Sequence, residues 1–219
     1  MNRSTNPFGS QQSVIWNQDR QLLQIADAAF ADAASRSGPH LVCRPGCTQC
    51  CHGAFAINAL DAQRLRQGIA ELSSAAPEKA AMIRARADLY WNEFGPSFPG
   101  DTTTGILGET EEAQEAFEDF ANEAACPALN PESGLCELYE YRPMTCRVFG
   151  PPVRSQAEPS DSEQSEEGLA ICELCFTTAN SEEIIAAEMQ VPHAEEAALL
   201  NQLGQPGETI IAWCLKSSD

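Results

Sequence analysis

Nine of the ten cysteines of this 219-residue chain fall into three short blocks, and these blocks constrain the fold more than any other feature. The blocks comprise Cys43, Cys47, Cys50 and Cys51, then Cys126, Cys136 and Cys146, and finally Cys172 and Cys175. The first has the spacing C-x3-C-x2-C-C, and the third is the sequence CELC. Gaps of two or three residues let a tight loop turn several thiols toward one metal ion or cluster. We therefore predict that these nine cysteines are metal ligands.

An even number of cysteines is also compatible with a disulfide framework, which requires an oxidising compartment. The segment 1–20 has no apolar core and no small-residue cleavage site of a signal peptide, so we expect a cytoplasmic protein. In a reducing compartment, clustered thiols are more typical of metal binding than of disulfides. We therefore favour metal binding.

Composition and charge bear on the partners of the chain. The formal net charge of −19 repels nucleic-acid phosphates and anionic lipid surfaces. No apolar run reaches the length of a membrane span. We therefore expect metal ions as partners, and neither nucleic acid nor a membrane; the sequence does not identify a protein partner.

The adjacent pair Cys50 and Cys51 indicates two nearby metal sites rather than one, because neighbouring side chains tend to point apart and so serve different metals more easily. Four thiolates suit zinc and iron–sulfur clusters alike, so the spacing does not choose between these cofactors. His40, His52 and His193 are expected to be polar loop or surface residues.

Apolar periodicity predicts a mostly α fold in which helices pack around irregular, cysteine-rich, metal-stapled loops. We expect one domain over 1–219, with a helical insertion at about 60–122 and an acidic mobile loop at 155–168. Helices are predicted over 14–36, from Asp61 through Ile69, and over 77–93, 109–125 and 181–203. Turn residues predict a loop over 95–108, and TIIAWCLK near the end is compatible with either a strand or a helical turn.

The cysteine motifs taken together resemble a known family. The order C-x3-C-x2-CC, CP-x-L and G-x-C-x2-Y-x2-RP-x2-CR is similar to the YkgJ-like cysteine-cluster family, described as a zinc- or iron-chelating domain. The flagellin lysine N-methylases carry a similar pattern. The resemblance covers 43–53 and 126–149 and extends weakly to CELC. It implies about eight core cysteines: the first two blocks and one of Cys172 or Cys175.

Four further residues belong to the family motif: Tyr139, Arg142, Pro143 and Arg147. We expect Arg142 or Arg147 to donate hydrogen bonds to cluster thiolates or sulfides, tuning their charge and potential. Pro143 is expected to stiffen the turn before Cys146, and Tyr139 to pack in the core. Cys214 lies outside the blocks, between Trp213 and Leu215, and is predicted to be a buried apolar residue.

These observations support two main functional hypotheses. The first is an iron–sulfur protein that supports redox or methyl-transfer chemistry, and the second is a non-catalytic, zinc-stapled interaction module. A lesser alternative is a radical SAM-like enzyme, because Cys43, Cys47 and Cys50 have its C-x3-C-x2-C spacing. Against it, Gln49 replaces the usual aromatic residue, and no strand–helix alternation predicts a barrel. We find no motif for other catalysis, so any enzymatic chemistry would come from the metal.

Overall fold

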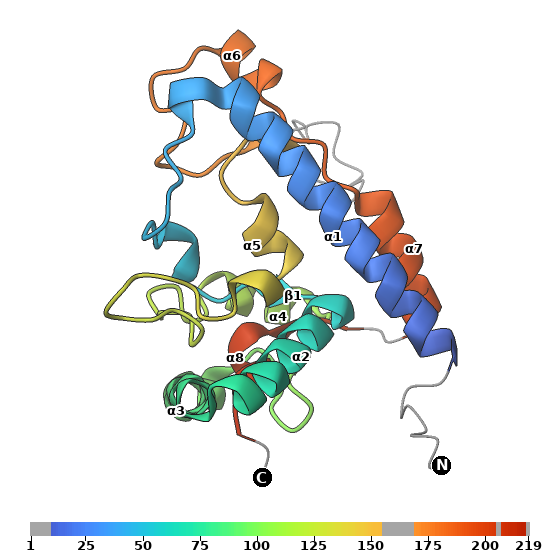
Figure 1. Cartoon of the computed structure of the whole chain (residues 1–219). Helices are drawn as coiled ribbons and strands as arrows, with labels where there is room; N and C mark the ends of the chain where they lie inside the picture. The colour runs from blue at the N-terminus through green and yellow to red at the C-terminus, as the bar shows by residue number, and fades with distance from the viewer. Residues whose placement is uncertain (1–9, 155–168, 205–206, 218–219) are drawn as a thin grey trace. The chain divides into compact units, whose positions relative to one another are not determined.

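The computed structural model describes residues 10–154, 169–204 and 207–217. This part of the chain is mostly helical, with eight α-helices and short two-stranded sheets, which confirms the predicted fold class (Figure 1). The chain divides into two compact units: unit 1 comprises 1–42 and 147–205, and unit 2 comprises 43–146 and 206–219. The predicted acidic loop at 155–168 lies outside the described residues. None of the helices described is long and apolar enough to cross a bilayer.

Unit 2 is built on three helices that contact one another: α2 (Ala59–Ala75), α3 (Pro77–Phe94) and α8 (Ile211–Leu215). The side chain of Asn58 caps α2 by accepting hydrogen bonds from the backbone N–H groups of Leu60 and Asp61, at 3.0 and 3.1 Å. Pro77 starts α3, where its missing N–H costs nothing. The buried faces of these helices form the main core of the unit. Its large members are Ile57, Leu65, Ile69, Ile83, Leu138, Ile211 and Leu215.

The remaining elements of unit 2 are short. Strand β1 (Ala56–Ile57) pairs antiparallel with β6 (Thr209–Ile210). The segment TIIAWCLK, whose sequence is compatible with either a strand or a helical turn, therefore contains a strand followed directly by α8. Strands β2 (Gly100–Asp101) and β3 (Ile106–Leu107) form a hairpin inside the predicted loop. Helix α4 (Glu111–Glu118) is shorter than the predicted 109–125. A second, aromatic core lies in this unit and includes Tyr90, Trp91, Phe94, Phe98, Phe120 and Trp213.

Unit 1 is organised by the long helix α1 (Ser10–Ser37), which contacts α6 (Ser181–Ala186) and α7 (His193–Leu203) (Figure 1). Leu22, Ala26 and Ala33 of α1 are buried, whereas Ile25 is 49% exposed. Strands β4 (Val153–Arg154) and β5 (Leu169–Ala170) pair antiparallel.

The further helix predicted over 181–203 consists of two separate helices, α6 and α7. Asn180 and Glu183 form a capping box at the start of α6. Pro192 precedes α7, and the residue before a proline is disfavoured in helical conformation. The sequence therefore carried the signal for this break.

Candidate metal centre

Backbone hydrogen bonds in unit 2 join the first cysteine block to the second. His52 and Ala125 form an antiparallel bridge, and the N–H of Cys126 donates to the carbonyl of Cys51 at 2.8 Å. Gly53 follows with a φ of +88°, a left-handed conformation that favours glycine. Cys51 and Cys126, which are 75 positions apart in the sequence, are thus held on neighbouring strand-like segments.

The loop of the second block folds back on itself. Leu129 and Cys136 form an antiparallel bridge, which returns the chain toward its start at Cys126. Arg86 of α3 braces this loop: its Nε donates to the carbonyl of Pro127 at 2.8 Å, and its guanidinium also pairs with Glu137. The predicted helical insertion therefore contributes a side chain that holds the cysteine loop.

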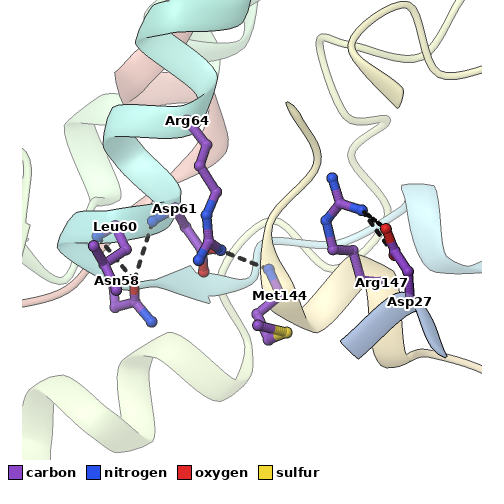
Figure 2. Close-up of polar contacts among 7 residues, drawn as sticks. All are labelled: Asp27, Asn58, Leu60, Asp61, Arg64, Met144 and Arg147. Atoms are coloured by element: carbon purple, nitrogen blue, oxygen red, sulfur yellow. Dashed lines mark hydrogen bonds and ion pairs between the residues drawn. The ribbon is translucent and has the colours of Figure 1, made fainter. Parts of the chain in front are cut away.

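Cys146 lies on the short helix α5 (Met144–Val148). The first three residues of this helix, up to Cys146, belong to unit 2, and the last two belong to unit 1. The backbone N–H of Met144 donates to Oδ1 of Asp61 at 2.8 Å. Asp61 also forms an ion pair with Arg64, one turn further along α2, and both side chains are buried (Figure 2). The start of α5 is thus tied to α2 within unit 2.

Five thiols of unit 2 act on one another electrostatically, and we call them the five-thiol cluster: Cys50, Cys51, Cys126, Cys136 and Cys146. The thiol of Cys51 donates a hydrogen bond to the sulfur of Cys50. The expectation that these two neighbouring side chains point apart is therefore wrong. Both residues lie on a local 3₁₀ turn, η2 (Gln49–Cys51).

The thiols of the cluster differ in acidity. The hydrogen bond from Cys51 lowers the pKa of Cys50 to about 6, against the effect of burial, and the positive charge of Arg142 acts in the same direction. Donating that bond raises the pKa of Cys51. Burial raises the pKa of Cys126 to about 12 and also raises the pKa of Cys136 and Cys146, with neighbouring thiolate charges adding to it. Cys50 is therefore the member of the cluster whose thiolate form is favoured, whereas the thiol form is favoured in its neighbours.

Arg142 is the arginine that acts on the cluster. Its charge favours the thiolate forms of Cys50 and Cys136, and its guanidinium carbon lies 3.7 Å from the centroid of the Tyr139 ring. Tyr139 itself is 57% exposed, so the prediction that it packs in the core is wrong. Its ring covers the arginine instead of filling the interior.

Arg147 belongs to unit 1 and contacts a carboxylate of α1. Its Nη1 donates to both carboxylate oxygens of Asp27, at 2.8 and 3.0 Å (Figure 2). The guanidinium is buried, whereas the Asp27 side chain is half exposed. This motif residue therefore forms an ion pair with α1 within unit 1.

The third block lies in unit 1 and has apolar surroundings. The N–H of Cys175 donates to the carbonyl of Cys172 at 2.8 Å, which closes a tight turn. Both side chains are only 4% exposed and pack in a hydrophobic cluster with Phe176 and Ala187. The N–H of Phe176 donates to the carbonyl of His40 at 2.9 Å, which ties this turn to the segment after α1.

The first two cysteines of block one lie on a turn. Cys43 is exposed and Cys47 is half-buried, and the N–H of Cys47 donates to the carbonyl of Arg44 at 3.0 Å. The turn contains Gly46 with a φ of +87°. Gly134 of the second block lies beside this turn: a Cβ there would be in ordinary van der Waals contact with the Gly46 carbonyl oxygen, at 3.5 Å.

Cys214 is buried in the main core on α8, as predicted. Burial raises the pKa of its thiol to about 12. This cysteine therefore behaves as a packed apolar residue next to α2 and α3.

The donor chemistry of the five-thiol cluster fits the metals that thiolates prefer, zinc and iron–sulfur clusters. All ten cysteines lie among the described residues, and none is in a disulfide. Within that part of the chain, no three His, Cys, Asp or Glu side chains already have the arrangement of a metal site. Metal binding would require these thiols to lose their protons.

Comparison with known proteins gives one match. The family model CxxCxxCC, described as "Putative zinc- or iron-chelating domain", matches residues 42–176, which include all nine predicted ligands. The first gap of this chain, between Cys43 and Cys47, is one residue longer than the family's name indicates. No curated protein and no solved structure matches the chain. The match supports metal binding in general.

Proposed function

Because the chain belongs to the CxxCxxCC family of zinc- or iron-chelating domains, we propose that it binds metal through the five-thiol cluster of unit 2. One observation carries this proposal: five half-buried thiols from three separate segments of unit 2 act on one another electrostatically. Ionised thiols that are buried together repel one another and lose hydration, and a bound cation offsets both costs.

We propose further that the metal is iron in an iron–sulfur cluster. The donor set consists of thiols, which are the ligands of such clusters. Arg142 places a positive charge beside Cys50 and Cys136, where it would offset the negative charge of a thiolate-bound cluster. With Cys43 and Cys47 of the adjoining turn, the first two cysteine blocks place seven thiols in unit 2, more than the four that one tetrahedral ion uses, which supports two sites.

The residues of the cluster have distinct roles in this proposal. Cys50 is the member whose thiolate form is favoured, so it is the first ligand to engage a metal. Cys126, Cys136 and Cys146 release their protons as they bind. The positive charge of Arg142 stabilises the thiolate forms of Cys50 and Cys136. The Cys172–Cys175 pair of unit 1 stays a predicted ligand pair because of its C-x2-C spacing.

Side chains from the helices of unit 2 already hold the cysteine loops in place, which favours a chemical role for the metal over a purely structural one. A metal staple is needed where a loop has no other support. Here Arg86 braces the loop of Cys126 and Cys136, and Asp61 holds the start of α5. We therefore propose redox chemistry, which a bound cluster would supply. Methyl transfer, the other expectation from the family resemblance, would require a donor site in addition.

A zinc-stapled interaction module is the alternative, and one observation favours it. The five-thiol cluster draws its members from three segments of unit 2, so a metal bound there would cross-link all three. Zinc bound by four cysteines performs this structural role in many small domains.

Anaerobic purification of the full-length chain separates the two candidates. Iron, acid-labile sulfide and zinc are measured per chain, together with the visible absorption spectrum. We expect iron and sulfide in similar amounts with broad visible absorption. A colourless protein with stoichiometric zinc would overturn the iron–sulfur assignment in favour of the zinc module. Protein without either metal would overturn both, and Cys214→Ala, outside the cluster, serves as the matched control that keeps its metal.

A further inference from the structure

Asp61 and Arg64 form an ion pair inside unit 2 that packing alone does not explain. Their side chains are 2% and 3% exposed. Removing two charges from water is costly, and replacing a buried pair with apolar side chains is often neutral or stabilising. A pair retained in the core next to α5 therefore indicates a specific task.

The contact with Met144 identifies that task. Asp61 Oδ1 accepts the N–H of Met144 at 2.8 Å, across 83 positions of sequence (Figure 2). Met144 is the first residue of α5, so its N–H is one of those that no carbonyl of the helix can satisfy. Leaving a buried N–H without an acceptor is costly, so this bond strongly favours one placement of the helix start.

Cys146 lies two positions beyond Met144 on the same short helix. The Asp61 carboxylate is close enough to this thiol for its charge to act on it. Arg64, paired with the same carboxylate, offsets that charge beside a group that must become negative to bind metal. The pair thus combines a hydrogen-bond anchor with near-neutral net charge.

We propose that Asp61, supported by Arg64, is a positioning residue for the metal site: it holds the start of α5 so that Cys146 presents its thiol to the five-thiol cluster. This inference rests on the proposed function and names a part of the site outside the cysteine motifs. Asp61 acts through Cys146 and is not itself a ligand.

Cobalt(II) is the probe, added to the reduced, metal-free, full-length chain without oxygen. Its thiolate charge-transfer absorption grows with the number of bound thiolates. Asp61→Ala removes the acceptor, so we expect cobalt affinity to fall by about 10- to 100-fold, the usual cost of losing a residue that orients a ligand. The absorption should fall to that of Cys146→Ser. Asp61→Asn keeps an oxygen acceptor in place and should restore the wild-type spectrum.

A double variant tests the route of action. If Asp61 works through Cys146, Cys146→Ser combined with Asp61→Ala binds cobalt no more weakly than Cys146→Ser alone. Asp61→Ala with Arg64→Met removes the whole ion pair and leaves no unpaired buried charge, so it serves if the single variant does not fold. Ile69→Val, a core change on the same helix, is the control for lost stability, and it should bind as wild type.

A readout without metal keeps this inference separate from the proposed function. In the metal-free protein, Asp61→Ala should raise the alkylation rate of Cys146 by iodoacetamide several-fold and leave that of Cys126 unchanged, as measured by mass spectrometry. Wild-type protein that binds no cobalt would refute the proposed function, while the alkylation rates would still decide the positioning role. An Asp61→Ala variant with wild-type cobalt absorption and a wild-type rate of Cys146 alkylation would overturn the inference. An equal loss of cobalt affinity in Asp61→Ala and Ile69→Val would also overturn it.

Discussion

The five-thiol cluster of unit 2 and the Cys172–Cys175 pair of unit 1 come from equally suggestive spacings, yet their surroundings differ. The cluster has a cation, Arg142, beside its thiols, and its loops are held by buried polar anchors. The pair lies on a tight turn within a hydrophobic cluster. Cysteine spacing predicts that thiols converge. A neighbouring cation and polar contacts that hold the cysteine loops indicate which of those thiols can carry negative charge.

The largest expected effect comes from removing a member of the cluster. Cys126→Ser and Cys146→Ser should each lower metal affinity by more than about a hundredfold, because losing a ligand costs more than losing a residue that orients one. The measurement is a competition titration against a chromogenic chelator. If both variants bound as tightly as Cys214→Ala, the cluster would not be the site.

The pH dependence of stability tests the same buried thiols without metal. Cys126 and Cys214 have a folded-state pKa of about 12, against an ordinary value of about 9. A raised pKa gives stability that is fully present below the unfolded pKa and is lost as pH rises through the folded one. We therefore expect the free energy of unfolding to fall between pH 9 and 12, by about 1.4 kcal/mol per pH unit for each such thiol.

Urea unfolding of the metal-free, reduced protein at pH 8, 9.5 and 10.5 measures this slope. Cys214→Ala should show a shallower slope, because one raised thiol is gone. Stability that stays constant over this range would show that these thiols are not held in their protonated form by burial.

The third block gives a smaller expected effect. Replacing Cys172 and Cys175 together by alanine should lower the metal content of the full-length chain, as their spacing predicts, but by less than Cys126→Ser does. Alanine avoids placing a hydroxyl in the apolar cluster. Elemental analysis measures the outcome, and unchanged metal with only reduced stability would make the pair a packing feature of unit 1.

The smallest effect concerns Arg142. Its charge helps to lower the pKa of Cys50, after the larger effect of the Cys51 hydrogen bond. Arg142→Met should therefore shift the midpoint of the Cys50 alkylation profile upward from about pH 6. Arg142→Lys keeps the charge and should leave the midpoint near its original value. An identical profile in Arg142→Met would remove this arginine from the site.

The sequence predicted the features that depend on local pattern. Apolar periodicity indicated α1 and α3, and the cysteine spacing indicated the family that the comparison shows. It missed features that arise from contacts distant in sequence. Asp61 looked only like a helix start, and nothing local indicated that its carboxylate would meet Met144. The contact between Cys50 and Cys51 lies on a single 3₁₀ turn, which periodicity does not reveal.

X-ray absorption at the metal edge tests the central claim most directly, on full-length chain purified without oxygen. The account predicts iron with a first shell of sulfur, and a lower iron content when Cys126, Cys136 and Cys146 are all replaced by serine, while Cys214→Ala retains the wild-type content. A first shell of nitrogen and oxygen alone, or an unchanged iron content in the triple variant, would contradict it.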